Sequence, residues 1–390
     1  MQAFTLLIKP SGSDCNINCE YCFYKDRPHR FGHGRQRMSE KVLEKLVEDY
    51  LGLGFPVAGF AWQGGEPTLM GVEFFQRAVR LQKKLALPGS QISNTMQTNG
   101  LLIDEKWCRF LRDNKFLIGI SIDGPAEFHD HYRVDNSGGG TFDKVMRAVE
   151  QFKQYDVQFN TLTLLNNRNV DKADELFDFL VGAGAGYMQF IPCVETEPLT
   201  GEISDFSITP RQYGDFLCRI FDRWYDYGPD KLNIREIDSL VSYFVLGKHT
   251  ICTYSKQCAG FVVVEHGGDC FCCEFFVKPE WRLGSILEAP LEKLASFALK
   301  RSFARKKQNL SDSCLLCRYL DLCRGGCMKD RVSTGGRPAR RSYFCESYRQ
   351  FFDHAVGRAK RLAAHITEGS VARKSRSPQD VRLQIPGKAQ

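Results

Sequence analysis

Short apolar runs rich in β-branched and aromatic residues alternate with amphipathic stretches over the first half of the chain. The apolar runs predict strands at residues 4–8, 57–62, 91–97, 116–122, 157–164 and 187–191. The stretches between them predict helices at residues 40–51, 73–85, 105–113, 142–155 and 172–181. Ser39, Asp104 and Asp171 are suited to cap three of these helices, because a short oxygen-bearing side chain can accept from first-turn amides. Six βα units in series predict an α/β fold with a parallel sheet, either an open doubly wound sheet or a partial barrel.

This alternation ends after residue 192. Helices are predicted at residues 210–227 and 235–246, and the cysteine-dense stretch 252–345 has too few long apolar runs to form a core of its own. Bound metal would have to organise that stretch. We therefore expect a partial barrel in residues 1–230, a cysteine-rich domain in residues 231–368 and a disordered basic tail in residues 369–390.

Composition and charge narrow the class of protein. Hydrophobic residues make up 43% of the 390 residues and charged residues 25%, as in a globular protein. No apolar run is long enough for a membrane span, and the N-terminal segment turns polar too soon for a secretory signal, so we expect a cytoplasmic protein with no membrane partner. Residues 369–390 hold five basic side chains against one acid, more than half of the net charge of +7. The remaining charges are mixed along the chain, which argues against a nucleic-acid surface.

The 16 cysteines indicate metal sites, since a reducing compartment disfavours disulfides. Cys15, Cys19 and Cys22 follow the first predicted strand with C-x3-C-x2-C spacing. Three thiolates leave the fourth corner of a site open, whereas a structural zinc site is normally closed by four ligands. A 4Fe-4S cluster with one open iron could instead bind the amino and carboxylate groups of a second molecule.

Eight further cysteines suffice for two complete four-cysteine sites. They are Cys252, Cys258, Cys273, Cys314, Cys317, Cys323, Cys327 and Cys345. On spacing alone, two zinc sites and two iron-sulfur clusters both remain open.

The first cysteine motif, with Tyr21 before its last cysteine, resembles the cluster-binding loop of the radical S-adenosylmethionine superfamily. The segments GGEP at residues 64–67 and SIDGP at residues 121–125 end two predicted strands, in the order seen in that superfamily. The resemblance implies contacts to S-adenosylmethionine from Tyr21, Gly64, Gly65, Glu66, Ser121, Arg133 and Val194. Ser121 and Arg133 would hold the ribose and the carboxylate, and Val194 would contact the adenine.

The second cysteine group resembles the SPASM extension of the superfamily, which carries two auxiliary 4Fe-4S clusters with interleaved ligands. The resemblance assigns Cys252, Cys258, Cys273 and Cys327 to the first auxiliary cluster. It assigns Cys314, Cys317, Cys323 and Cys345 to the second. The implied architecture is a partial (β/α)6 TIM-type barrel with a C-terminal iron-sulfur SPASM domain, holding three 4Fe-4S clusters and S-adenosylmethionine.

Within the superfamily the chain is most similar to the anaerobic sulfatase-maturating enzymes, through LLIKPSGSDCN, WQGGEPTL, QTNG, SIDGP and the GGC at residues 325–327. Those enzymes oxidise a cysteine or serine of a sulfatase to formylglycine. The family places an aspartate, assigned as the base, after the third ligand of the first auxiliary cluster, and here the position is Glu274. The implied mechanism uses a 5′-deoxyadenosyl radical to remove a β-hydrogen, Glu274 to take a proton and the auxiliary clusters to carry an electron away.

The expected partners are a sulfatase or peptide substrate and a reducing donor such as ferredoxin or flavodoxin. Tyr24, Gln63 and Gln97 are candidate substrate contacts. Two other functions remain open: a related maturase that crosslinks or epimerises a ribosomal peptide, and a non-catalytic zinc or electron-transfer protein. Such maturases often begin with a winged-helix domain, and because 14 residues precede Cys15 the sulfatase function is favoured.

Five cysteines fall outside the three sites. Cys108 and Cys218 lie inside amphipathic helices and are expected to pack as small hydrophobes. Cys193 lies beside the predicted adenine contact, and packing is its expected role too. The sequence leaves open whether Cys270 and Cys272, next to a candidate ligand, are structural or redox-active.

Overall fold

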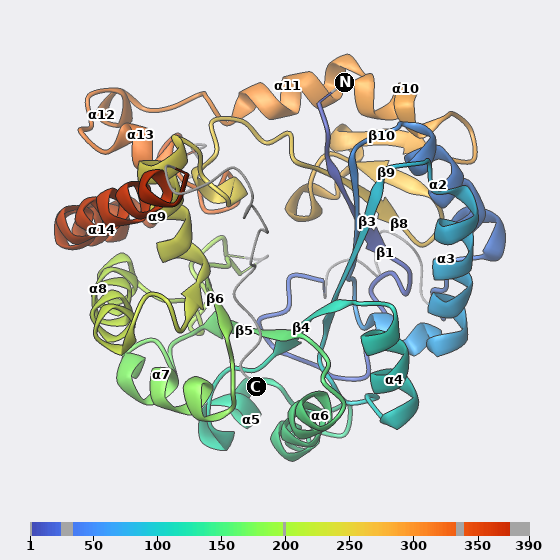
Figure 1. The fold of residues 1–390 in the computed structure, drawn as a ribbon, viewed down its shortest axis with the longest axis horizontal. Helices are drawn as coiled ribbons and strands as arrows, with labels where there is room; N and C mark the ends of the chain where they lie inside the picture. Colours follow the sequence, from blue (N-terminus) through green and yellow to red (C-terminus); the bar gives the residue numbers. More distant parts are fainter. Residues whose placement is uncertain (1, 25–33, 198–199, 333–338, 375–390) are drawn as a thin grey trace.

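The computed structural model describes residues 2–24, 34–197, 200–332 and 339–374. Strands and helices alternate through the first half, with the strands inside and the helices around them (Figure 1). The strands of this half are β1 (Thr5–Lys9), β2 (Val57–Trp62), β3 (Gln91–Thr98), β4 (Leu117–Ser121), β5 (Phe159–Leu165) and β6 (Tyr187–Pro192). The helices are α2 (Glu40–Gly52), η1 (Pro67–Met70), α3 (Val72–Leu85), α4 (Glu105–Asp113), α5 (Ala126–Tyr132), α6 (Phe142–Gln154), α7 (Ala173–Gly182) and α8 (Pro210–Tyr227).

The second half adds short strands and further helices. The strands are β7 (Asn233–Ile234), β8 (Phe261–Glu265), β9 (Asp269–Phe271) and β10 (Arg282–Ser285). The helices are α9 (Arg235–Leu246), η2 (Cys252–Tyr254), η3 (Glu274–Phe276), η4 (Pro279–Trp281), α10 (Leu291–Ser296), α11 (Ala298–Lys306), α12 (Asp312–Leu315), α13 (Leu320–Cys323) and α14 (Cys345–Lys374).

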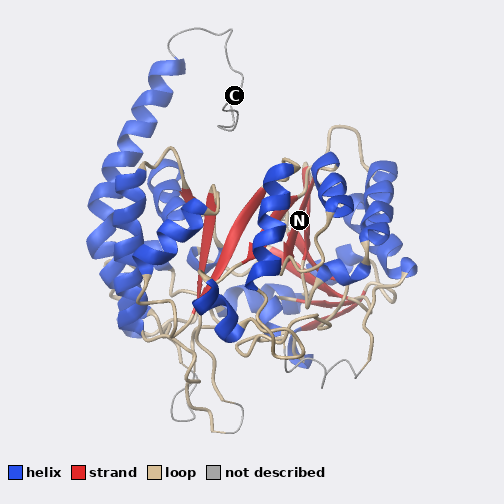
Figure 2. Ribbon diagram, turned by 90° about the horizontal axis from the view of Figure 1, so that it is seen from below, coloured by secondary structure: helices blue, strands red, loops and turns tan. Residues whose placement is uncertain are grey.

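In the described residues one sheet of ten strands runs in the order β10-β9-β8-β1-β2-β3-β4-β5-β6-β7. Every pairing from β8 to β7 is parallel, and only β9 and β10 are antiparallel. The six predicted βα units are therefore present, and the predicted partial barrel is confirmed. Figure 2 shows the same arrangement from below, with strands inside and helices on both sides.

The two faces of the sheet have different environments. On β6, Met188 and Phe190 point outward and are buried against helices, whereas Gln189 and Ile191 on the other face are half-buried. One part of the inner face is closed by a small apolar group formed by Leu7, Ala61, Val263, Phe271 and Val277. The rest of that face keeps polar side chains within reach of a ligand.

The cysteine-rich half is joined to the barrel through the sheet. Strand β8 pairs with β1 in register from Thr5 with Phe261 to Lys9 with Glu265, and Val262 and Val264 belong to the main core. Helix α14 packs on α8 and α9 (Figure 1). The strands of the two halves therefore form one sheet. The predicted domain boundary at residue 231 falls just before β7.

Two predictions about helix ends are confirmed and one is wrong. Ser39 accepts from the amide of Val42, and Asp104 accepts from the amide of Trp107, so both cap their helices. Helix α7 instead has Lys172 at its N-cap without a side-chain cap. The carboxylate of Asp171 accepts from Gln212 Nε2 at 2.8 Å, which turns it toward α8.

The predicted disordered tail begins too early. Helix α14 continues to Lys374, so residues 369–374 are helical, and the remainder of that prediction lies outside the described residues. Among the described helices, none is both long and apolar enough to cross a membrane.

Candidate functional site

The loop after β1 carries Cys15, Cys19 and Cys22 and is held against the loop after β2. The amide of Gly65 donates to Gly12 O at 2.8 Å, and the amide of Glu66 donates to Asp14 O at 2.7 Å. A Cβ on Gly65 would lie 1.9 Å from Asp14 O. From the sequence, Gly65 was predicted to contact a ligand. The structure shows a second reason for glycine at this position: any side chain would collide with the backbone of the cysteine loop.

The three thiols of this loop lie in one group with Tyr21 and Cys193. Asn99 Nδ2 donates to Cys15 Sγ at 3.6 Å, and Arg133 Nη1 donates to Cys19 Sγ at 3.9 Å. Burial raises the pKa of the Cys15 thiol to about 12, and Glu66, Cys19 and Cys22 act in the same direction. A metal cluster would supply the positive charge that such buried thiolates need, so the donor set fits one.

Asp123 organises the residues beside this loop, and the sequence analysis did not single it out. It is fully buried, accepts from the Tyr21 hydroxyl and lies 3.0 Å from Arg133 Nε in an ion pair. The Arg133 guanidinium lies 5.6 Å from the centre of the Tyr21 ring. The signal was present in SIDGP as a charged residue directly after a buried strand, where parallel sheets place functional groups.

Glu66 ties the ends of β2 and β3 together. Its carboxylate is buried and accepts from the amide and hydroxyl of Thr68, the hydroxyl of Thr98 and the amide of Asn99, at 2.6–2.9 Å. Burial raises the pKa of Glu66, and these four hydrogen bonds oppose the shift. These hydrogen bonds hold the segment of Gly64, Gly65 and Glu66, which is predicted to contact a ligand, in one position without any ligand.

The remaining predicted cofactor contacts lie on the inner face of the barrel or at its rim. Ser121, at the end of β4, accepts from Gln97 Nε2 at 2.9 Å. Gly119, also on β4, makes room for the side chain of Gln97 on β3, because a Cβ at position 119 would lie 2.0 Å from Gln97 Oε1. Val194 is buried, and its carbonyl accepts from Lys329 Nζ at 2.7 Å.

Lys329 is a residue that the sequence analysis missed. Its ammonium also pairs with Glu195 at 2.7 Å, so it connects the segment after β6 with the segment after Cys327.

Three of the proposed reaction residues converge on Lys9, a third residue that the sequence analysis missed. Lys9 is fully buried, and its ammonium donates to Gln63 Oε1 and to Glu274 Oε2, both at 3.0 Å. It also lies 5.0 Å from the centre of the Tyr24 ring. A lysine that ends the apolar strand sequence LLIK is the signal that could have been noticed. The structure therefore brings Tyr24, Gln63 and Glu274 together around one cation, and places Gln97 with Ser121 instead.

The four cysteines predicted for the first auxiliary site come from separate segments and lie near one another. Cys252 begins η2, Cys273 precedes η3, and Cys258 and Cys327 lie in loops. Burial raises the pKa of Cys273 to about 12, with further increases from Glu274, Cys258 and Cys252. Burial also raises the pKa of Cys327, and Asp330, Cys273 and Cys252 add to that shift.

The four cysteines predicted for the second auxiliary site line one cavity of about 530 Å³. Ser311 Oγ donates to Cys314 Sγ at 3.3 Å, and the amide of Tyr319 donates to Cys317 Sγ at 3.5 Å. Donors to sulfur favour thiolates, and the volume suits a cluster of several atoms, so these residues also fit an iron-sulfur group. In the described part of the chain, no three His, Cys, Asp or Glu side chains are arranged to hold a single metal ion.

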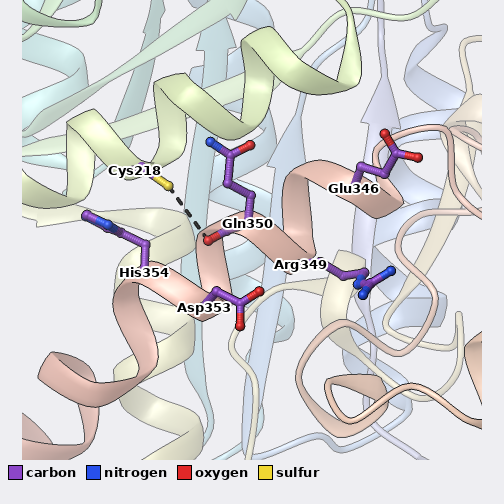
Figure 3. A pocket seen from close by; sticks show the side chains of 6 residues that line it. All are labelled: Cys218, Glu346, Arg349, Gln350, Asp353 and His354. Atoms are coloured by element: carbon purple, nitrogen blue, oxygen red, sulfur yellow. Dashed lines mark hydrogen bonds between the residues drawn. The ribbon is translucent and has the colours of Figure 1, made fainter.

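The five other cysteines are placed in packing positions. Cys108, Cys193, Cys270 and Cys272 are at most 2% exposed. Figure 3 shows Cys218 on α8 facing α14, where its thiol donates to Gln350 O at 3.8 Å. The hollow drawn there lies on the surface between these two helices and includes none of the predicted site residues.

Comparison with known proteins places these features in a family. Residues 10–180 match the family model described as Radical SAM superfamily. The chain is 37% identical to the cysteine-type anaerobic sulfatase-maturating enzyme of Clostridium perfringens, over 94% of this chain and 100% of that protein. It is 35% identical to the serine-type anaerobic sulfatase-maturating enzyme of Bacteroides thetaiotaomicron, over 90% of this chain and 89% of that protein. The solved structure of native anSMEcpe with bound AdoMet and Cp18Cys peptide superposes with a TM-score of 0.86 at 36% identity, over 94% of this chain and 100% of that one.

Proposed function

The chain belongs to the anaerobic sulfatase-maturating enzymes of the radical S-adenosylmethionine superfamily, and on that premise we propose that it oxidises a cysteine or serine of a sulfatase to formylglycine. The observation that carries this proposal is the convergence of Tyr24, Gln63 and Glu274 on the buried Lys9. This group lies where β1 and β2 end, at the edge where parallel barrels place their reactive groups. Relatives of the cysteine and serine types are almost equally similar, so both side chains are candidate substrates.

The cofactors would be held by the groups described above. Cys15, Cys19 and Cys22 would bind one 4Fe-4S cluster, next to a site for S-adenosylmethionine formed by Tyr21, Gly64, Gly65, Glu66, Ser121, Arg133 and Val194. When bound, these cofactors supply a carbon radical that removes one hydrogen atom from the substrate β-carbon. Arg133 and Asn99, which donate to two of the thiols, would orient the cluster loop.

Glu274 would act as the base. Oxidation of the side chain removes a hydrogen atom, a proton and an electron, and the Glu274 carboxylate would receive the proton from the thiol or hydroxyl. Lys9 holds this carboxylate in place by a 3.0 Å ion pair. The glutamate carboxylate, one methylene farther from the backbone than the family aspartate, is thereby held at the end of β1.

The electron needs an acceptor and the first cluster needs a donor. Two auxiliary clusters, on Cys252, Cys258, Cys273 and Cys327 and on Cys314, Cys317, Cys323 and Cys345, would supply the accepting groups. A reducing protein of the ferredoxin or flavodoxin class is the proposed donor.

The test is turnover of sulfatase-type peptides by the reconstituted enzyme under anaerobic conditions. Peptides with Cys-x-Pro-x-Arg, or with serine or alanine at the first position, are incubated with S-adenosylmethionine and a reductant, and the products are weighed by mass spectrometry. We expect a loss of about 18 Da from cysteine or about 2 Da from serine, as for an aldehyde, and no change in the alanine peptide. Formation of 5′-deoxyadenosine without any oxidised peptide would contradict the sulfatase function while leaving the superfamily chemistry intact.

A further inference from the structure

Three basic side chains surround the first four-cysteine site. Lys300 on α11 is 6% exposed, and Lys307, which follows the end of that helix, is 0% exposed. Arg331 is half-buried and follows Cys327 in the chain. None of these three residues was noted from the sequence, and none belongs to the S-adenosylmethionine site or to the group around Lys9.

Each of the three is fixed to the backbone of a loop that carries a cysteine ligand. Lys307 Nζ donates to Cys252 O and Thr253 O, both at 2.7 Å. Lys300 Nζ donates to Phe261 O and, at 3.1 Å, to Cys272 O, next to the ligand Cys273.

Arg331 completes the group from the other side. Its Nη2 donates to Lys307 O at 2.8 Å and to Gly325 O at 3.4 Å, two residues before Cys327. Arg331 Nε is buried without a hydrogen-bond partner in the described residues.

No carboxylate forms an ion pair with any of the three in the portion of the chain that the structure describes, although burying an uncompensated charge is costly. Asp330 is a buried acid nearby; burial raises its pKa to about 6, and Lys329 opposes this shift more strongly than Lys307 does. Lys307 and Lys300 instead donate to the backbone of the segments that carry Cys252 and Cys273. When a cluster is bound, its thiolates are the negative groups on these same segments, so the cysteine site is the partner of these cations.

We propose that Lys300, Lys307 and Arg331 form a cationic shell that raises the reduction potential of a 4Fe-4S cluster on Cys252, Cys258, Cys273 and Cys327. This inference rests on the proposed function, which supplies the cluster. An electron accepted by a cluster adds one negative charge, and fixed cations that are themselves buried, such as Lys300 and Lys307, stabilise that charge at short range. The first auxiliary site is thus built to take the electron from the oxidised substrate.

The second auxiliary site has a different environment. It lines an open cavity in which the basic side chains include Arg341 and Arg349, both solvent-exposed. Water screens exposed charges, so they influence a cluster less than buried ones do. The shell therefore predicts that, of the two auxiliary clusters, the first has the higher potential.

The experiment is a redox titration of the holoenzyme followed by electron paramagnetic resonance, in wild type, K300M, K307M and R331M. Each variant should lower the potential of the first auxiliary cluster, so that its reduced-to-oxidised ratio at a fixed solution potential falls on the order of tenfold, as expected for one charge at an effective dielectric constant of about 20. In K300M and K307M the signals of the other two clusters should stay in place, whereas R331M should also lower the potential of the second auxiliary cluster, because Gly325, to which Arg331 donates, is as close along the chain to Cys323 as to Cys327. Lys306 gives a matched control, because it is adjacent to Lys307 but exposed, and K306M should leave all three potentials unchanged.

Several outcomes would overturn the shell. The first is an unchanged potential of the first auxiliary cluster in variants that keep their full iron content. The second is loss of this cluster in all three variants, because the cations would then be needed for cluster assembly and not for its potential. K307R, which keeps the charge, should restore most of the wild-type potential. Failure of the proposed function is distinguishable, because it would appear as absent peptide oxidation or missing iron in the wild type, whatever the variants do.

Discussion

At the residue scale, the pair formed by Lys9 and Glu274 joins two distant parts of the chain at the proposed reaction site. The ammonium lies at the end of β1, and the carboxylate lies one residue beyond the predicted ligand Cys273. Because Lys9 has no contact with solvent, its charge is compensated by the groups around it. Both residues are therefore open to direct tests.

Replacing the base should stop oxidation without dismantling the site. We expect E274Q to retain iron and S-adenosylmethionine cleavage but to form oxidised peptide about 10²- to 10⁴-fold more slowly, the usual cost of removing a general base. E274D should retain more activity than E274Q because it keeps a carboxylate. Mass spectrometry of the peptide, with 5′-deoxyadenosine measured in parallel, separates the two effects, and an E274Q enzyme as active as wild type would remove Glu274 from the mechanism.

Removing the cation should act through Glu274. K9M leaves the carboxylate without its 3.0 Å partner, so we expect the rate of the oxidation step to fall by about 10- to 100-fold, with a smaller change in KM. In an E274Q background, the same K9M change should have little further effect on single-turnover rates. Equal effects of K9M in both backgrounds would show that Lys9 serves the fold rather than the base.

The identities of the chemical groups could be predicted from the sequence at this scale, but their partners could not. The eleven predicted cluster cysteines lie in three groups: the spacing indicated the first group of three, whereas the division of the other eight came from the family resemblance. Lys9 and Asp123, beside apolar strands, and Lys329, in the loop after Cys327, were missed because a single charged residue looks like a surface position until long-range contacts are known.

At the scale of elements, helix α9 begins with a buried acid. Glu236 is 6% exposed, and its Oε2 has no hydrogen-bond partner within the described residues. Burial raises the pKa of Glu236 to about 7, and the opposing effects of Arg235 and backbone amides do not cancel that shift. The start of α9 thus holds a carboxyl group that folding prefers to keep protonated.

This group gives the stability of the protein a definite pH dependence. The folded state keeps the proton to a higher pH than the unfolded state, so the free energy of unfolding should fall as the pH rises from about 4.5 to about 7. E236Q removes that loss and should stabilise the protein at pH 8 by on the order of 3 kcal/mol, with little gain near pH 4.5.

Denaturant unfolding at both pH values measures the effect. E175Q on α7 is the control because Glu175 is exposed, and it should leave both curves unchanged. A stability difference between wild type and E236Q that is the same at both pH values would contradict the assignment.

The long elements could be predicted because each carries several turns of apolar periodicity. Strand β2 and helices α4, α8 and α9 have the predicted bounds. Strands β7, β9 and β10 have only two to four residues and were missed, since so short a run has no period that separates it from a loop. Strand β8 is as long as β1 and was missed because it lies in the cysteine-rich stretch, outside the alternation of strands and helices. Their positions are set by pairing with β6 and β1, which is information from distant parts of the chain.

At the scale of the whole molecule, the three cysteine sites belong to one continuous structure. The loop that carries Cys15 follows β1, and β8, in the cysteine-rich half, pairs with that same strand. The sequence predicted the barrel and the cysteine-rich half as separate units, because nothing in the local pattern marks β8 as a partner of β1.

We expect about twelve iron and twelve sulfide per chain after anaerobic reconstitution, from one set of three and two sets of four cysteines. Replacing Cys15, Cys19 and Cys22 together with alanine should remove about four of each and leave the thermal unfolding of the rest largely unchanged. Metal analysis by plasma mass spectrometry provides the count. Stoichiometric zinc with little iron in anaerobically purified protein would be incompatible with three clusters.

The parallel pairing of β1 with β8 also affects how the protein is made. About 250 residues separate the two strands in the chain, and at 5–20 residues per second a ribosome needs roughly 12–50 s to synthesise them. During that interval the edge of β1 that will pair with β8 has no partner strand, although the first cysteine loop has already left the ribosome. Unpaired strand edges attract other chains, so we expect the nascent barrel to be most prone to association with other chains in the interval before β8 is synthesised.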